Sequence, residues 1–267
     1  MTEAPTEKMK NEQVITGHPE IKVSIITPAY NAEKYIEETI QSVKAQSHSN
    51  WEMIVIDDGS TDNTASIVAH FAKEDGRIIL IKNGQNKGVA LSRNEGLKIA
   101  NGKYAAFLDS DDLWDEDKIK KQLDFMETNH CVITFTSYQK FSAKTREYGK
   151  VIKAPKSVSA EELLGNTIIG CLTVMVNREE AGEFYMPNLK HMEDQATWYS
   201  IMQRGYEAYG LPDVLAYYRE EDKSLLSNKA KAAKLQWNVY RSYFRFSVGK
   251  SVGYFAKYAK NAVKKYI

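Results

Sequence analysis

Short apolar runs alternate with amphipathic segments along the first half of the chain. The apolar runs are rich in β-branched residues, as buried strands are, and lie at 22–30, 51–58, 77–82 and 103–109. Apolar positions at helical spacing fill the segments between them, at 31–47, 61–75 and 86–102. This alternation predicts an α/β fold with a mostly parallel, Rossmann-like sheet that carries helices on both faces.

The second half of the chain has a mixed pattern. Strand-like runs lie at 131–142, 170–178 and 213–220, and a helical pattern lies at 193–205. No internal repeat or low-complexity linker divides the chain. We therefore expect one domain over 21–226, a disordered leader over 1–20 and a basic, amphipathic helical tail over 227–267.

Carboxylates follow two of the predicted strands directly. Asp57 and Asp58 come after the second strand, and Asp109 and Asp111 come after the fourth. In parallel sheets ligands bind beyond the carboxyl ends of the strands. Carboxylates this close repel one another unless a cation or a donor-rich ligand lies among them. A hard divalent cation held by few carboxylates keeps positions open for substrate phosphates, so Asp109 and Asp111 predict a metal and diphosphate site.

Ordinary structural explanations compete with each of these assignments. Acidic residues favour the first turn of a helix, which explains Asp112, Asp115 and Asp117. An Asp-Gly turn with a helix cap explains Asp58 equally well, and a capped helix start explains Asp194. The chain also lacks the glycine-rich dinucleotide fingerprint and the P-loop motif, which argues against two large classes of nucleotide-binding enzyme.

Charge is segregated along the chain although the total is nearly neutral. The formal net charge is +1, but residues 223–267 contain 11 Lys and Arg and no Asp or Glu, leaving 25 basic and 35 acidic residues elsewhere. Helical winding places Lys257, Lys260 and Lys264 on one stripe, broadly opposite apolar residues. Such a helix suits an anionic membrane surface, bound through 229–267. The alternative is a helix packed on the domain with its lysines in water.

Composition places the protein in a reducing, aqueous compartment. The chain is 43% hydrophobic and 27% charged, as in globular proteins, and its two cysteines are far apart. The start lacks an apolar signal core, and the longest apolar stretch, 168–176, is about half the length of a membrane span. We expect a cytoplasmic protein, peripheral on the inner face of the membrane. Nucleic acid is not an expected partner, because no recognised binding module accompanies the charge.

Five motifs, in this order, resemble the inverting family 2 glycosyltransferases of the GT-A fold. They read SIITPAYN, IVIDDGSTDNT, NKGVALSRNEGL, FLDSDDLW and MEDQATW, within a resemblance that covers roughly residues 22–225. The later sequence is similar to the subgroup that builds bacterial surface polysaccharides, such as the teichuronic acid, capsule and O-antigen glycosyltransferases.

The resemblance implies a nucleotide-diphospho-sugar donor, usually a UDP-sugar, and Mn²⁺ or Mg²⁺ as the cofactor. The implied donor-binding residues are Thr27, Pro28, Ala29, Tyr30, Asp58, Arg93, Asp109 and Ser110. The first four would line the uridine, Asp58 would meet the uracil edge, and Arg93 would lie near Asp58 or the phosphates. Asp109 would reach the ribose, and Asp111 would ligate the metal.

Asp194 matches the position of the catalytic base in this family, and the adjacent Glu193 is a second, lower-ranked candidate. The resemblance further implies transfer of one sugar per binding event to a saccharide acceptor linked to a polyprenyl diphosphate. The pattern and membrane spans of processive synthases are absent from the sequence. A non-catalytic sugar-nucleotide or glycan binder on the same scaffold is the alternative function.

Overall fold

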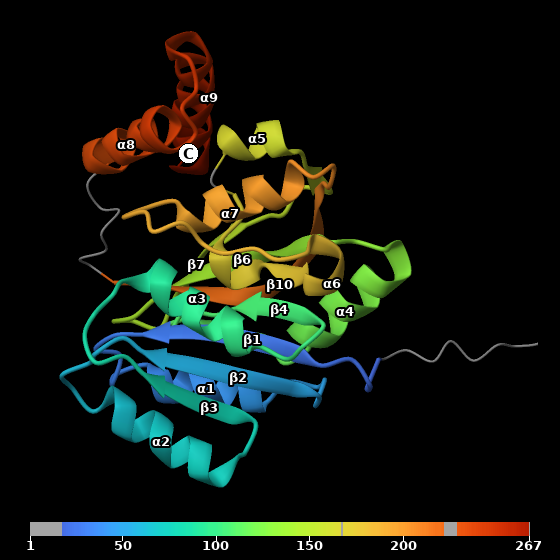
Figure 1. Cartoon of the computed structure of the whole chain (residues 1–267), viewed down its shortest axis with the longest axis vertical. Helices are drawn as coiled ribbons and strands as arrows, with labels where there is room; N and C mark the ends of the chain where they lie inside the picture. Colours follow the sequence, from blue (N-terminus) through green and yellow to red (C-terminus); the bar gives the residue numbers. More distant parts are fainter. Residues whose placement is uncertain (1–17, 167, 222–228, 267) are drawn as a thin grey trace, which may run out of the picture.

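A central β-sheet with helices on both faces organises the molecule (Figure 1). The computed structural model describes residues 18–166, 168–221 and 229–266, so nearly all of the expected leader lies outside the described residues. The strands are β1 (Val23–Ala29), β2 (Trp51–Asp57), β3 (Ile78–Lys82), β4 (Tyr104–Phe107), β5 (Leu113–Trp114), β6 (Ile133–Ser142), β7 (Tyr148–Ile152), β8 (Ser157–Val158), β9 (Met175–Asn177) and β10 (Ala208–Glu220).

Helices connect most of these strands. They are α1 (Ile36–Lys44), α2 (Thr64–Glu74), α3 (Val89–Ile99), α4 (Lys118–Asn129), α5 (Ala160–Leu164), α6 (Arg178–Ala181), α7 (Glu193–Met202), α8 (Lys229–Asn238) and α9 (Val248–Tyr266). A 3₁₀ turn, η1 (Cys171–Thr173), precedes β9, and a π-helical segment, η2 (Val239–Tyr243), continues α8.

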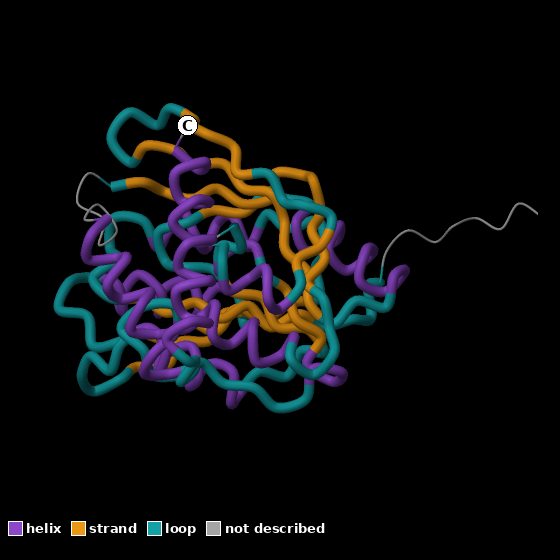
Figure 2. Tube along the Cα trace, turned by 90° about the horizontal axis from the view of Figure 1, so that it is seen from above, coloured by secondary structure: helices purple, strands orange, loops and turns teal. Residues whose placement is uncertain are grey.

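The first half of the chain forms the parallel part of the sheet. The strand order is β3-β2-β1-β4-β9-β6-β10-β5, and the first four of these strands pair in parallel. The predicted α/β fold is therefore confirmed. β9 then joins β4 and β6 in antiparallel pairs, while β6 and β10 pair in parallel. Seen from above, the strands form a twisted, curved band (Figure 2).

The strand expected over 170–178 is wrong in its first half. The backbone N–H and the hydroxyl of Thr173 both donate to the carbonyl oxygen of Gly170, at 2.9 and 2.6 Å, and close a turn there. Only Met175–Asn177 remain to pair as β9. An apolar run does not distinguish a buried turn from a buried strand.

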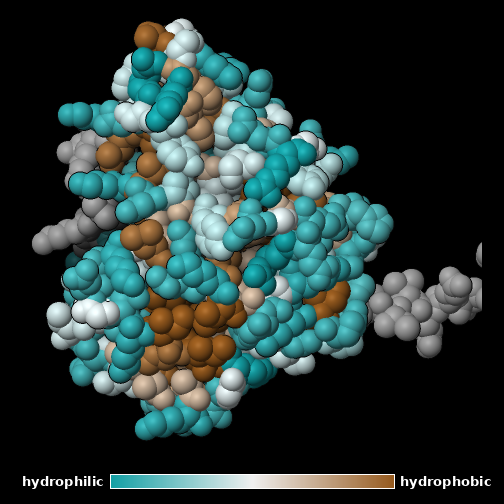
Figure 3. Space-filling view, in the orientation of Figure 1, coloured by the Kyte–Doolittle hydropathy of each residue, from teal (hydrophilic) through white to brown (hydrophobic). Residues whose placement is uncertain are grey.

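Each face of the sheet has its own apolar core. Neighbouring residues of β1 point to opposite faces, so Ile26 packs with Ile54 and Leu97 on the side of α3 and α7, whereas Ile25 packs with Ile36 on the side of α1, α2 and α4. This two-sided burial explains why the strands read as continuous apolar runs. α3 lies against β1 and β2, and apolar side chains gather on the same face over β2 and β3 (Figure 3).

The C-terminal helices pack on α5 and α7 (Figure 1). Tyr240 and Tyr254 are buried, and Phe246 lies between them in an aromatic cluster that extends to Tyr199 of α7. Lys250, Lys257 and Lys260 of α9 are exposed, as are Val248 and Val252. The aromatic residues of the tail therefore pack on the domain, while part of its aliphatic surface stays exposed. No helix of the described residues is long and apolar enough to cross a membrane.

α3 approaches the sheet closely at Gly96. A β-carbon at this position would lie 2.8 Å from Cδ1 of Ile56 and 2.9 Å from Cγ2 of Ile26. We expect Gly96→Ala to lower the free energy of unfolding by about 1–3 kcal/mol in urea denaturation, because the crowding outweighs the gain in helix propensity. Gly249→Ala, in α9 with no atom within 4 Å, is the control and should be neutral or stabilising. Equal stabilisation by both changes would contradict this packing.

Candidate active site

The carboxyl ends of β1, β2 and β4 meet at one edge of the sheet, and most of the predicted site residues lie there. β1 and β2 end in register, with Ala29 opposite Asp57. The backbone N–H of Asp58 donates to the carbonyl oxygen of Ala29 at 2.8 Å, so Asp58 and Tyr30 extend from neighbouring strand ends. Asp109 and Asp111 follow β4 at the same edge.

Arg93 connects this edge to the second half of the chain. Its side chain is only 4% exposed. Nη2 lies 2.6 Å from Oδ1 of Asp109, and Nη1 lies 2.9 Å from Oε1 of Glu193. The resemblance implied Asp58 or the phosphates as neighbours of Arg93, but its ion pairs are with these two other carboxylates. Arg93 thereby places the start of α7 beside the end of β4.

Asn94 fixes the segment that leads into α7. Its side-chain oxygen accepts a hydrogen bond from the backbone N–H of Met186, and its Nδ2 donates to the carbonyl oxygen of Met186, both at 2.8 Å. This pairing resembles one step of a β-ladder made by a side chain. The sequence analysis missed Asn94, because its partner lies 92 residues away and no local pattern marks it.

The two acidic residues at the start of α7 lie in different environments. Glu193 is held by Arg93, whereas the Asp194 carboxylate accepts a hydrogen bond at Oδ1 from the adjacent backbone N–H of Gln195 at 2.7 Å. Burial and the neighbouring charge of Glu193 raise the pKa of Asp194 to about 7. A carboxyl group with a pKa near the working pH suits proton transfer. Of these two carboxylates, Asp194 is therefore the one that is not paired with Arg93.

The Asp109–Asp112 turn contains two partly exposed carboxylates, Asp109 and Asp111, and one buried carboxylate, Asp112. Burial and the charge of Asp109 raise the pKa of Asp111 to about 6. Asp112 is buried, and its Oδ1 accepts a hydrogen bond from the backbone N–H of Arg219 at 2.8 Å. Asp112 is therefore a structural residue of β10 packing. The explanation of Asp112 as an acidic residue in the first turn of a helix is wrong, because α4 begins only at Lys118.

Arg219 of β10 supports this turn through hydrogen bonds. Nε donates to the carbonyl oxygen of Asp111 at 2.5 Å, and Nη2 donates to Glu38 at 2.9 Å. The guanidinium lies over the rings of Tyr35 and Phe141, 4.4 and 4.6 Å from their centroids. Arg219 was also missed from the sequence, because β10 reaches this turn only through the long-range topology of the sheet.

The donor set at this turn suits a cation that takes most of its ligands from substrate. No group of three His, Cys, Asp or Glu in the described part of the chain is arranged to hold a metal by itself. One oxygen of Asp109 is bonded to Arg93, which leaves Asp111 as the accessible oxygen ligand. Mg²⁺ and similar hard ions are commonly held by one or two carboxylates together with phosphate oxygens. The residues present therefore fit such an ion.

Asp58 anchors the loop between β3 and α3 at this edge of the sheet. Its Oδ1 accepts from Nδ2 of Asn83 at 2.8 Å and from the backbone N–H of Lys87 at 3.0 Å, and its Oδ2 accepts from the backbone N–H of Gly88 at 2.8 Å. Burial opposes ionisation, but these bonds outweigh it and lower the pKa of Asp58. The carboxylate therefore stays ionised and holds the loop that leads into α3.

The four residues expected to line the uridine differ in exposure. Thr27, Pro28 and Ala29 are buried in β1, so they can reach a nucleotide only through main-chain atoms, whereas Tyr30 is 50% exposed. Ser110 is partly exposed, and its carbonyl oxygen accepts a hydrogen bond from the hydroxyl of Thr39 at 3.0 Å. Tyr30 is thus the member of this group that offers a side chain to a ligand.

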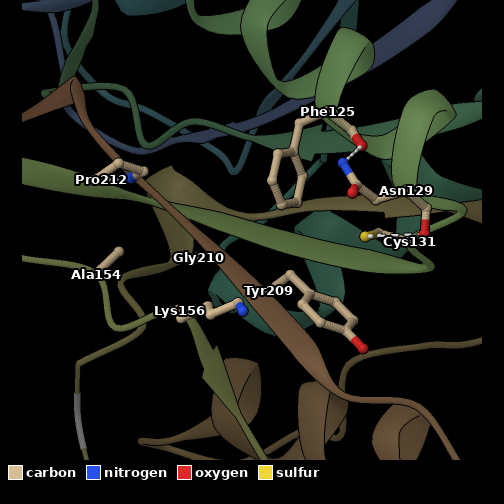
Figure 4. Close-up of a pocket in the computed structure, with 8 residues that line it drawn as sticks. All are labelled: Phe125, Asn129, Cys131, Ala154, Lys156, Tyr209, Gly210 and Pro212. Carbon is tan, nitrogen blue, oxygen red and sulfur yellow. Dashed lines mark hydrogen bonds between the residues drawn. The ribbon is translucent and has the colours of Figure 1, made fainter.

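A cavity lies at the opposite edge of the sheet, beside the starts of β6 and β10 (Figure 4). Its volume is about 560 Å³. It is lined by Phe125, Asn129, Cys131, Ala154, Lys156, Tyr209, Gly210 and Pro212. None of the predicted site residues is among them, and the lining contains no carboxylate that could act as base or metal ligand.

Comparison with known proteins shows the family of the chain. Glycosyl transferase family 2 matches residues 24–209. The chain is 49% identical to the putative teichuronic acid biosynthesis glycosyltransferase TuaG of Bacillus subtilis, over 91% of this chain and 96% of that protein. It is 37% identical to WfgD of Escherichia coli, a UDP-Glc:α-D-GlcNAc-diphosphoundecaprenol β-1,3-glucosyltransferase, over 91% of this chain and 94% of that protein.

Solved structures show the same fold. Staphylococcus aureus TarS 1–349, in complex with UDP-GlcNAc, superposes with a TM-score of 0.68 at 21% identity, over 90% of this chain and 72% of that one. The mannosyltransferase PcManGT of Pyrobaculum calidifontis, in complex with GDP-Man and Mn²⁺, superposes with a TM-score of 0.67 at 19% identity, over 93% of this chain and 72% of that one. The fold is the predicted GT-A fold, and the family match together with the two close relatives shows that the chain is a glycosyltransferase that belongs to glycosyl transferase family 2.

Proposed function

We propose that this enzyme transfers one sugar from a UDP-sugar to a saccharide carried on a lipid diphosphate, with inversion at the anomeric carbon, in the synthesis of a bacterial surface polysaccharide. The observation that carries the proposal is the bridge from Asp109 through Arg93 to Glu193, which brings Asp194 beside the strand-end carboxylates. The names of TuaG and WfgD support the pathway and the lipid-linked acceptor.

The donor would lie over the ends of β1, β2 and β4. The exposed ring of Tyr30 offers a face to a base, and Asp58 keeps the neighbouring loop in place. Asp111 would hold Mn²⁺ or Mg²⁺, with Asp109 and Ser110 toward the ribose. When bound, the cation neutralises the charge that develops on the leaving diphosphate. The UDP-GlcNAc of TarS and the Mn²⁺ of PcManGT support this donor and cofactor.

Asp194 would take the proton from the acceptor hydroxyl as its oxygen attacks the anomeric carbon. Glu193 is occupied by Arg93 and serves instead to orient the start of α7. Because the base acts on one face of the sugar and the diphosphate leaves from the other, the configuration inverts. A non-catalytic binder would need neither Asp111 nor Asp194 in this arrangement.

The enzyme would work at the inner face of the membrane, where a lipid-linked acceptor is available. Lys250, Lys257 and Lys260 are exposed on α9, and they support contact with anionic lipids through residues 229–267. Tyr240 and Tyr254 of the tail are already buried against the domain, so the exposed lysines would provide most of this contact.

Asp194→Asn should lower kcat by roughly 10²–10⁴, because a general base is worth about that factor. UDP affinity should be unchanged, since Asp194 does not line the nucleotide. The measurement is steady-state transfer together with calorimetric titration of UDP. Glu193→Gln is the matched control for charge and should have a smaller effect on kcat. An equal loss of UDP binding in Asp194→Asn would contradict the assignment.

The raised pKa of Asp194 also predicts a pH-dependent stability difference. The folded state holds a proton up to about pH 7, whereas the unfolded state releases it near pH 3.8, so this residue costs stability as pH rises through that range. Asp194→Asn should therefore raise Tm more at pH 8 than at pH 4, measured by thermal denaturation. The same difference at both pH values would show that the carboxyl group is not desolvated.

Metal-dependent binding of UDP tests the donor site. Calorimetric titration with Mn²⁺ should show binding of UDP in preference to GDP and ADP, and EDTA should weaken it. Affinity for Mn²⁺ should fall below about pH 6, because the pKa of Asp111 is raised to that value and protonation removes the ligand. Asp111→Asn should abolish the metal dependence. Binding of UDP that ignores the metal would overturn the role of Asp111.

A further inference from the structure

A second cavity, of about 320 Å³, lies between the segment before α7 and the C-terminal helices. One wall belongs to residues 189–191, which end three residues before the proposed base Asp194, and the other belongs to α8 and η2. It is lined by Leu189, Lys190, His191, Leu235, Asn238, Val239, Ser242 and Tyr243. We call it the arm cleft, because the C-terminal helices form an arm that supplies one of its two walls.

The C-terminal helices are fixed beside the base by polar contacts. Nε2 of Gln236 donates to Oε1 of Gln195, the residue that follows Asp194, at 3.2 Å. Gln195 in turn donates to the carbonyl oxygens of Leu163 and Asn166, both at 2.8 Å. The hydroxyl of Tyr240 donates to the carbonyl oxygen of Leu164. The wall formed by α8 therefore has a defined position relative to Asp194.

The lining of the arm cleft is amphipathic. Leu189, Leu235 and Val239 provide apolar surface, and the side chain of Tyr243, 42% exposed, adds an aromatic wall. Lys190 provides a cation, and His191, whose pKa burial lowers, offers a ring N–H while neutral at pH 7. The residues lining the cleft include no Asp or Glu. Apolar surface beside a cation suits a ligand with an anionic head and a hydrocarbon chain.

We infer that the arm cleft binds the isoprenoid diphosphate part of the lipid-linked acceptor. This inference rests on the proposed function and assigns the acceptor side of the same site. Lys190 and His191 meet the diphosphate, and the first isoprene units lie against Leu235, Val239 and Tyr243. The acceptor sugar then lies between the cleft and Asp194, three residues from His191 along the chain.

The chemistry of a lipid-linked acceptor matches this order. In an acceptor such as the GlcNAc-diphosphoundecaprenol in the name of WfgD, the diphosphate is attached at C1, and a β-1,3-transferase uses the hydroxyl at C3. Diphosphate and nucleophile are therefore on two carbons of one pyranose ring that are separated by C2. A site for such an acceptor needs an anion-binding group about one sugar away from the base, and it needs an apolar surface beyond it.

Farnesyl diphosphate, a water-soluble isoprenoid diphosphate, tests the arm cleft directly. Binding is measured by calorimetry in the presence of saturating UDP and Mn²⁺, so that the donor site is already occupied. The full-length protein should bind it. Ser242→Trp, which fills the cleft from an exposed position, and Lys190→Ala, which removes the cation, should each weaken binding at least tenfold. UDP binding by both variants should equal that of the unmodified protein.

Two control variants match these changes outside the cleft. Val252→Trp adds the same ring at an exposed position of α9, and Lys73→Ala removes an exposed lysine of α2. Both should bind farnesyl diphosphate normally. Equal affinity in Ser242→Trp, Lys190→Ala and the unmodified protein would overturn the inference, as would equal binding of inorganic diphosphate or of an uncharged farnesol. Failure of the unmodified protein to bind UDP would instead contradict the proposed function.

Discussion

The buried guanidinium of Arg93 is the interaction on which the site depends. A buried charge costs several kcal/mol unless it is paired and hydrogen-bonded, and removing one partner of such a pair is costly. Arg93 takes its two partners from distant parts of the chain, Asp109 after β4 and Glu193 at the start of α7. The fold therefore stabilises Arg93 only when the second half of the chain has docked on the parallel sheet.

This pairing also assigns different roles to two adjacent carboxylates. Arg93 satisfies Glu193, and the charge of Glu193 then raises the pKa of its neighbour, Asp194. Burial acts in the same direction, so the ion pair of Glu193 and the desolvation of Asp194 together give this carboxyl group a pKa near 7, as the proposed base requires. A buried carboxylate of this kind makes the fold less stable than an uncharged side chain would. Desolvated groups with shifted pKa values are typical of functional sites.

The sequence predicted what local patterns determine. Alternating runs predicted β1 to β4 and their helices, and the shared edge of parallel strands predicted that Asp58, Asp109 and Asp111 would gather. It did not predict Asn94 with Met186 or Asp112 with Arg219, because these partners are 92 and 107 residues apart. Their pairing follows from the insertion of β9, β6 and β10 after β4, and no periodicity of the chain encodes that order.

The tail illustrates a further limit, because an amphipathic pattern does not say what covers its apolar side. In the structure Tyr240 and Tyr254 pack inward while Lys250, Lys257 and Lys260 remain exposed, so the two explanations open from the sequence are compatible. Packing uses the aromatic residues, and these lysines are still available to anionic lipid. Contact of this kind would be electrostatic and sensitive to salt, without insertion of the helix. It would hold the arm cleft close to the membrane surface, where the isoprenoid chain of the proposed acceptor would enter the cleft and its sugar would reach Asp194.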